Sequence, residues 1–331
     1  MNSAFNSPTW HKLKWPLAAL MLVLLYNYFY TPGFFQIEMK AGRLFGSLID
    51  VLNRAAPVMI ISLGMTLVIA TGGVDLSVGA VMAISGAIAA LLIAKGFALP
   101  LVLMISLGVA IVAGVWNGLL IGYFKVPPIV ATLILMVSGR GVAQLLTGGN
   151  HIPFKHAGFE FIGRGYLAAI PFAAVLTLLL FITFVIISKR TAAGLFIEAT
   201  GDNEVASRYA GVQTRVVQFA VYAACSLCAG IAGLIATANL AEADPSAAGI
   251  GLELDAILAV VIGGTALQGG RYFLAGSLMG AILLQTLTTT ILTRGVPTQW
   301  TQVVKALVII IVCLLQSEVF RRSFQRKPAT A

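Results

Sequence analysis

The chain has 331 residues, of which 59% are apolar and only 10% are charged. Soluble domains carry about 25% charged residues, and the mean hydropathy here is +0.96. This balance excludes a water-soluble globular protein and predicts an all-α, polytopic membrane protein that forms one domain over residues 1–331. The net charge of +9 is typical of basic loops on the cytoplasmic side of a membrane. Because no basic face with interleaved aromatic residues occurs, we expect no nucleic-acid partner.

A membrane-spanning helix needs about 20 apolar residues, and apolar runs follow one another along most of the chain. They predict about ten transmembrane helices, at residues 15–31, 55–72, 75–94, 98–124, 127–147, 167–188, 216–240, 254–268, 271–293 and 300–319. No small-residue cleavage site follows the first run, which we interpret as an uncleaved span. The eighth run is short and fits a half-span, so eight or nine spans remain open. With ten, both termini lie on one side, and the Lys and Arg distribution favours the cytoplasm.

Two similar segments predict an inverted repeat. Asp75 begins the third run and Asp255 begins the eighth, each followed by apolar and small residues. Because the two segments are five spans apart, the two halves of the chain would have opposite orientations, which is a common plan among transporters. Glycines also repeat every fourth residue in the fourth run, at positions 114, 118 and 122. Such stripes predict close helix packing.

The most informative stretch is residues 71–79, Thr-Gly-Gly-Val-Asp-Leu-Ser-Val-Gly, which interrupts a nearly continuous apolar region. A broken helix at membrane depth is tolerated only where protein or water covers the backbone. We expect Asp75 either to cap the following helix or, with Ser77, to line a translocation path. Asn117 in the fourth run either bonds a neighbouring helix or joins that path.

A second acidic group, which includes Glu253 and Asp255, precedes and begins the eighth run. We expect this segment outside the cytoplasm, where it is either a solvated loop, a surface for a basic partner, or part of the path. Cys225 and Cys228 lie three residues apart on one face of an apolar helix, so we expect them to pack rather than bind metal. The sequence predicts no cofactor.

The longest cytoplasmic loop, residues 189–215, predicts a two-turn helix at 203–210. Asp202 is a suitable N-cap, Glu204 and Arg208 form an i,i+4 pair, and Gly211 suits the C′ position. A helix of this length is marginal alone, so the loop must lean on the rest of the protein or on another subunit. A P-loop and the common hydrolase motifs are missing from the sequence. These observations favour a transport subunit, while a self-contained secondary transporter or channel remains the alternative.

Residues 72–79, Gly-Gly-Val-Asp-Leu-Ser-Val-Gly, resemble a signature of the permease subunits of bacterial sugar ABC importers of the ribose type. Residues 253–264 resemble the second signature of that family, and the resemblance extends over about residues 43–316. Within the family, residues 49–57, 131–137, 139–144 and 195–199 are similar to galactofuranose importer permeases. Residues 148–166 fit no such pattern.

This resemblance implies a permease that hydrolyses no ATP itself and carries a sugar across the bacterial inner membrane. Its implied partners are two ATP-binding subunits, a second permease that is either different or identical, and a periplasmic sugar-binding protein. The loop at 189–215 would dock the ATPase through Glu198, Gly201, Asp202, Asn203, Glu204, Arg208 and Gly211. The path would include Asp75, Ser77, Asn117, Glu253 and Asp255.

Overall fold

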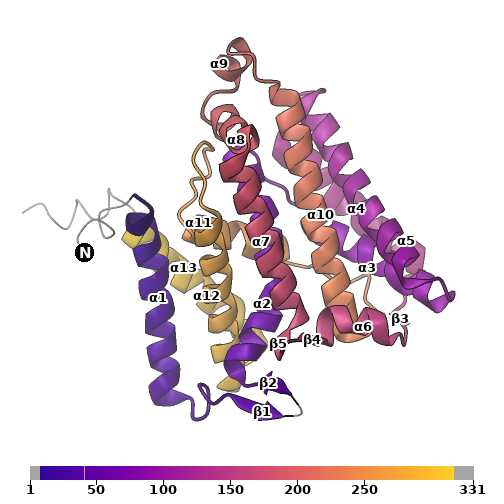
Figure 1. Cartoon of the computed structure of the whole chain (residues 1–331), viewed down its shortest axis with the longest axis vertical. Helices are drawn as coiled ribbons and strands as arrows, with labels where there is room; N and C mark the ends of the chain where they lie inside the picture. The colour runs from indigo at the N-terminus through magenta and orange to yellow at the C-terminus, as the bar shows by residue number, and fades with distance from the viewer. Residues whose placement is uncertain (1–7, 41, 317–331) are drawn as a thin grey trace, which may run out of the picture.

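The computed structural model describes residues 8–40 and 42–316, which form thirteen helices and six short strands (Figure 1). The helices are α1 (Pro8–Tyr30), α2 (Ser47–Ala70), α3 (Val78–Ala94), α4 (Leu99–Gly122), α5 (Pro128–Thr147), α6 (Ala157–Arg164), α7 (Phe172–Arg190), α8 (Ala192–Asp202), α9 (Glu204–Tyr209), α10 (Thr214–Leu240), α11 (Leu252–Ile262), α12 (Leu274–Thr293) and α13 (Thr298–Gln316). The strands are β1 (Glu38–Lys40), β2 (Arg43–Phe45), β3 (Ile152–Pro153), β4 (Tyr166–Leu167), β5 (Ile170–Pro171) and β6 (Glu242–Ala243).

Each of the ten apolar runs overlaps a helix, and residues 317–319 of the last run lie outside the described residues. Within the described part of the chain, six helices are long and apolar enough to cross a membrane, namely α2, α4, α5, α7, α10 and α12. The eighth run forms the 11-residue helix α11, as expected for a half-span. The second helix begins at Ser47 rather than at residue 55, because polar residues such as Asn53 and Arg54 continue the helix beyond the apolar run.

Helices α2 and α10 form the centre of the bundle. Most of the apolar window of α2 is buried, 83%, against 11% for α7. Helix α10 packs on α2, α3 and α4, while α2 packs on α10, α11 and α12. The predicted glycine stripe lies at one of these contacts, since a Cβ on Gly114 or Gly118 would meet the backbone of α10. Helix α2 therefore packs mainly with helices from later in the chain, and α10 with helices from earlier in it.

Two non-helical breaks interrupt the bundle. The first, residues 71–77, joins α2 to α3, and the second, residues 241–251, joins α10 to α11. The breaks meet where α3 begins, because a Cβ on Gly249 would lie 2.5 Å from the Gly79 carbonyl oxygen. Asp75 precedes α3, whereas Asp255 lies inside α11. The two acids therefore do not occupy equivalent positions.

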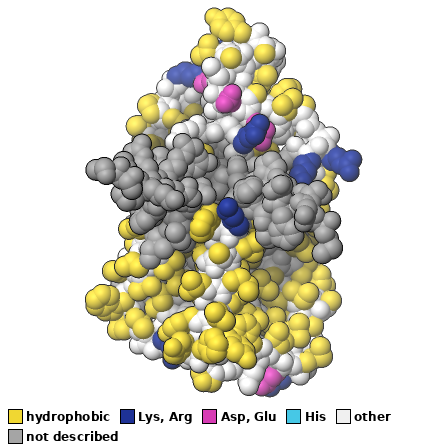
Figure 2. All heavy atoms as spheres, turned by 90° about the vertical axis from the view of Figure 1, so that its left-hand side faces the viewer, with side chains coloured by type: hydrophobic (Ala, Val, Ile, Leu, Met, Phe, Trp, Pro, Cys, Tyr) yellow, Lys and Arg dark blue, Asp and Glu magenta, His cyan; other side chains and the backbone are white. Residues whose placement is uncertain are grey.

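The small strands all lie at one end of the bundle, opposite α8 and α9 (Figure 1). Strands β1 and β2 form an antiparallel hairpin, as do β4 and β5, while β3 pairs with β6. These strands have only two or three residues and lie in the loops between helices, so the bundle itself is all-α as predicted. On the face in Figure 2, hydrophobic side chains cover much of the lower half, and most charged side chains lie in the upper half or at the lower edge. Such a distribution suits a protein whose apolar part contacts lipid.

Candidate functional site

The first break is organised by a hydrogen-bonded group of polar residues that is fully buried. Asp75 Oδ1 accepts hydrogen bonds from the Ser77 backbone nitrogen at 2.9 Å and from its hydroxyl at 2.6 Å. Asn117 Nδ2, on α4, donates to Ser77 Oγ at 3.0 Å. All three side chains have no exposed surface. The break is thus fixed to α4, and Asp75 also holds Ser77, the residue at the N-cap position of α3.

Helix α10 supplies two further members of this group, Tyr222 and Cys225, which the sequence analysis did not assign to it. The Tyr222 hydroxyl lies so close to Gly73 that a Cβ there would collide with it. The Cys225 thiol lies beside the Asp75 carboxylate. Both side chains are buried. Their one-turn spacing places Tyr222 and Cys225 on one face of α10. The sequence alone does not reveal that this face packs against the first break.

Several atoms of this group lack a hydrogen-bond partner among residues 8–40 and 42–316. They are Asp75 Oδ2, Asn117 Oδ1 and the Tyr222 hydroxyl oxygen. Leaving a buried polar atom unpaired costs about 1–3 kcal/mol. We call these five residues, Asp75, Ser77, Asn117, Tyr222 and Cys225, the polar cluster. Its spare hydrogen-bonding capacity suits bound water or a rearrangement of the first break.

The second break carries a separate group of charges. Arg140 Nη1, on α5, donates to the carbonyl oxygens of Ala248 and Pro245. Lys305, on α13, donates to Asp255 Oδ2 at 2.9 Å, and these two side chains are 17% and 21% exposed. Glu253 lies beside the start of α3, with Oε2 2.7 Å from where a Cβ on Gly79 would stand. Arg140 on α5 therefore holds the second break, and Lys305 on α13 holds α11.

The five residues expected along the path do not form one site. Asp75, Ser77 and Asn117 lie together in the buried polar cluster. Glu253 lies near them, at the meeting of the two breaks. Asp255 lies apart and pairs with Lys305. Both members of the Asp255–Lys305 pair are partly exposed, so the pair lies at the surface of the chain.

The predicted loop helix exists as α9, but its N-cap differs from the prediction. Asn203 is the cap, with its Oδ1 accepting a hydrogen bond from the Ala206 nitrogen at 2.9 Å. Asp202 instead ends α8, a helix that the sequence analysis did not predict. Asp202 and Asn203 are both good caps, and the end of the preceding helix decides between them. The C-terminal prediction is confirmed, since Gly211 has a φ of +90° and follows α9.

Glu204 fixes α9 to the rest of the chain. Its Oε1 accepts hydrogen bonds from Lys125, Arg208 and Thr214, of which the Arg208 contact is the predicted i,i+4 pair. Partial burial raises the pKa of Glu204, but the hydrogen bonds from these neighbours and the charge of Lys125 outweigh it and hold the pKa below its usual value. The loop therefore leans on its own bundle through a charged contact.

Helices α8 and α9 together form a projecting tip (Figure 1). This tip exposes both apolar and charged side chains. Tyr209 is 89% exposed and Val205 is 63% exposed. Of the residues expected to dock an ATPase, Asp202, Asn203, Arg208 and Gly211 are exposed, while Glu198, Gly201 and Glu204 are partly buried. An exposed aromatic side chain on such a tip is typical of a residue that anchors a partner.

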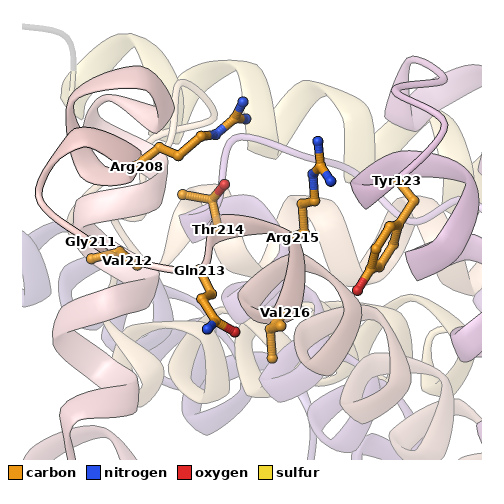
Figure 3. A pocket seen from close by; sticks show the side chains of 8 residues that line it. All are labelled: Tyr123, Arg208, Gly211, Val212, Gln213, Thr214, Arg215 and Val216. Carbon is orange, nitrogen blue, oxygen red and sulfur yellow. The ribbon is translucent and has the colours of Figure 1, made fainter.

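A hollow of about 340 Å³ lies beside the tip, between α9 and the start of α10 (Figure 3). Figure 3 shows the guanidinium groups of Arg208 and Arg215 pointing to the same side of it. Arg215 also lies over the Tyr123 ring, 5.6 Å from the ring centre. This basic hollow is suited to an acidic side chain.

Known proteins share this sequence over nearly its whole length. The family model described as "Branched-chain amino acid transport system / permease component" matches residues 47–313. The galactofuranose transporter permease YtfT of Escherichia coli is 50% identical over 93% of this chain and 92% of its own. The fructose import permease FruF of Bifidobacterium longum is 38% identical over 92% and 87%. The ribose import permease RbsC of Escherichia coli is 32% identical over 95% and 96%.

No solved structure matches the chain. The family model is named for amino acids, whereas these three relatives are named for sugars. The match spans both breaks and the α8–α9 tip, as the resemblance of residues 72–79 and 253–264 led us to expect. The chain belongs to the permease family of ABC importers, in its ribose-type sugar group.

Proposed function

We propose that this chain forms the membrane path of an ATP-driven importer for galactofuranose or a similar monosaccharide in the bacterial inner membrane. The observation that carries the choice of sugar is the 50% identity to a galactofuranose permease over 93% of the chain. The relatives named for fructose and ribose are less similar, at 38% and 32% identity. A periplasmic sugar-binding protein would deliver the sugar to the end that carries the strands.

The loop at residues 189–215 would dock one of two ATP-binding subunits. This proposal is supported by the projection of α8 and α9 beyond the bundle and by the exposure of Tyr209. The residues with the docking role are Glu198, Gly201, Asp202, Asn203, Glu204, Arg208 and Gly211. Glu204 would act indirectly, because it fixes α9 to the bundle. The hollow beside Arg208 and Arg215 would accept an acidic side chain of the ATPase.

The path would run along the face that carries Glu253 and the Asp255–Lys305 pair, with a second permease on the other side. Partly exposed charges at membrane depth support this choice, since lipid contact would be costly. Asp75, Ser77 and Asn117 would support the path without lining it, because they are buried and hold the first break in place. Co-purification distinguishes a second permease of different sequence from a second copy of this chain.

We further propose ten membrane crossings, an inverted repeat and cytoplasmic termini for a single transmembrane unit at residues 1–331. The exchange of the second long helix of each half supports the repeat, since α2 packs with α11 and α12 while α10 packs with α3 and α4. The end that carries α8 and α9 would face the cytoplasm.

Uptake in cells that lack the native permease tests the proposed function. Cells carrying this chain with its partner ATP-binding subunit and sugar-binding protein should accumulate labelled galactofuranose, and less ribose or fructose. Replacing the P-loop lysine of the ATPase should stop uptake. Uptake that continues without ATP hydrolysis would contradict the importer assignment, and equal uptake of branched-chain amino acids would contradict the sugar.

A further inference from the structure

A groove of about 300 Å³ lies between α1, α12 and α13. Most of its lining is apolar, with Leu22 and Val23 on α1, Leu287 and Ile291 on α12, and Val304 on α13. Ligand pockets in proteins begin at about 300 Å³. The groove therefore has room for part of an elongated apolar molecule.

The groove lies towards the end of the bundle that carries the strands, which α1 reaches just before β1 (Figure 1). Tyr30 is the last residue of α1, and Arg294 directly follows the last residue of α12. Because α12 is long and apolar enough to cross a membrane, its end marks the edge of the apolar layer. Tyrosine is enriched at that depth, where its ring contacts both acyl chains and headgroups. The groove thus extends from this edge into the apolar layer.

Arg294 lies at the outer end of the groove. Its guanidinium group lies over the Tyr26 and Tyr30 rings, 5.5 and 5.7 Å from their centres, and these two rings stack on each other. Arg294 is exposed, and its side chain forms no ion pair or hydrogen bond with any residue that the structure describes. The N–H donors of the guanidinium group are therefore free for a ligand, and arginine binds phosphate through two parallel hydrogen bonds.

Helices α1 and α12 are joined beside the groove, which fixes its width. Asn27 Nδ2, on α1, donates to Thr290 Oγ1, on α12, at 2.7 Å, and both side chains are buried. On α13, Val304 lines the groove, whereas the next residue, Lys305, pairs with Asp255 on α11. Helix α13 thus presents one face to the groove and a neighbouring face to the proposed path. A molecule in the groove would contact α13 without entering the path.

We propose that this groove is a binding site for one anionic phospholipid of the surrounding membrane. Its phosphate would bind Arg294, and an acyl chain would lie along the apolar lining. An interfacial arginine alone only anchors a helix, but here an unpaired guanidinium group stands at the mouth of an apolar groove, and basic pockets between membrane helices suit anionic headgroups. A zwitterionic headgroup suits the site less well, because its own cation competes with Arg294 for the phosphate.

The bound lipid would complete the contact of α1 and α13 with α12. This inference goes beyond the proposed function, since it requires only that the chain lies in a membrane. It depends on neither the sugar nor the ATP-binding subunits, so either proposal can fail without the other.

Lipid titration of the full chain, purified in mild detergent and stripped of lipid, tests the inference by native mass spectrometry. The wild type should bind phosphatidylglycerol about tenfold more tightly than phosphatidylcholine with the same acyl chains, as expected for a charge-assisted contact. Arg294→Gln should remove this preference. Arg43→Gln is the matched control, because Arg43 also lies over a tyrosine ring, at 5.3 Å from the Tyr166 ring centre, but in β2. It should keep the preference.

Equal affinity of the wild type for the two lipids would overturn the inference, as would a preference that Arg294→Gln retains. An Arg294→Gln chain that loses the second permease during purification, with its lipid preference unchanged, would assign the groove to a protein partner and equally overturn it.

A second test separates the lipid from its headgroup and also serves if Arg294→Gln fails to reach the membrane. Glycerol phosphate, which has the charge but no acyl chain, should not displace phosphatidylglycerol from the wild type. Val304→Phe narrows the groove and leaves Arg294 in place. It should weaken phosphatidylglycerol binding about tenfold, the usual effect of overfilling a packed site. Displacement by glycerol phosphate, or wild-type affinity in Val304→Phe, would overturn the proposed acyl-chain site.

Discussion

Asp75 binds the start of α3 through one carboxylate oxygen, and its second oxygen lacks a hydrogen bond in the described part of the chain. The sequence left two interpretations of this residue, a helix cap and a path element. The N-cap position of α3 is taken by Ser77 rather than by Asp75, which accepts hydrogen bonds from the Ser77 nitrogen and hydroxyl. The unpaired oxygen of Asp75 and its neighbours Tyr222 and Cys225 were not predictable, because they depend on how α10 packs. The same limit explains the cap of α9, where Asn203 replaces the expected Asp202.

Replacing Asp75 separates its two interpretations. Asp75→Asn keeps an oxygen for the Ser77 hydrogen bonds, so the protein should reach the membrane normally, while uptake should fall about tenfold, since hydrogen bonds to charged groups contribute about 1.5–3 kcal/mol. Asp75→Ala removes both hydrogen bonds from Ser77 and should also lower the thermal stability of the detergent-solubilised protein. Equal stability losses in the two variants would contradict this division.

The lowered pKa of Glu204 predicts a pH dependence for α9. A carboxylate whose pKa is lower in the folded state contributes stability above its unfolded pKa and loses it as the pH falls through its folded pKa. At neutral pH, Glu204→Gln should therefore speed hydrogen exchange in α9, and the difference from wild type should vanish in acid. Glu38→Gln, in the β1–β2 hairpin, is the control and should leave α9 exchange unchanged. Identical α9 exchange in wild type and Glu204→Gln at neutral pH would contradict the prediction.

At the scale of elements, hydropathy located every long helix, because lipid imposes a length and a composition on each. It also located both breaks, since glycines and acids within apolar runs mark them. It missed the first residues of α2 and the whole of α8. Those segments are amphipathic or polar, and they become helical through contacts with the bundle that hydropathy does not report.

The Asp255–Lys305 pair joins α11 to α13 and predicts a double-variant effect. Lys305→Ala leaves the Asp255 carboxylate unpaired in a partly buried site, which should cost on the order of 3 kcal/mol. Removing both charges with Lys305→Ala/Asp255→Ala should recover most of the thermal stability. Lys40→Ala breaks an exposed pair with Glu38 and should change little. A double variant no more stable than Lys305→Ala would show that the pair does not join these helices.

At the scale of the whole molecule, the sequence predicted a polytopic bundle and, through its resemblance, a permease. It did not predict that α2 packs with α11 and α12, or that α10 packs with α3 and α4. The apolar sequence of a helix carries little information about which other helix packs against it. The arrangement matters for the proposed mechanism, since the two breaks meet at the contact between Gly79 and Gly249.

The orientation of the bundle is directly measurable. A cysteine at position 209, on the exposed tip, should react with an impermeant maleimide only in inverted membrane vesicles. A cysteine at position 40, in the β1–β2 hairpin, should react only in right-side-out vesicles. Both experiments use a background that lacks Cys313, whereas Cys225 and Cys228 are buried. Labelling of both positions from the same side would contradict the assigned topology.

The central claim, a permease that docks ATP-binding subunits through α8 and α9, is tested most directly by affinity purification from native membranes in mild detergent, followed by mass spectrometry. The account predicts an ATP-binding subunit and a sugar-binding protein in the eluate with the wild-type chain. A second permease sequence there would make the importer a heterodimer, and its absence a homodimer. Glu198→Lys should remove the ATP-binding subunit and leave the chain in the membrane. A wild-type chain that purifies alone and carries sugar into vesicles without ATP would contradict the account.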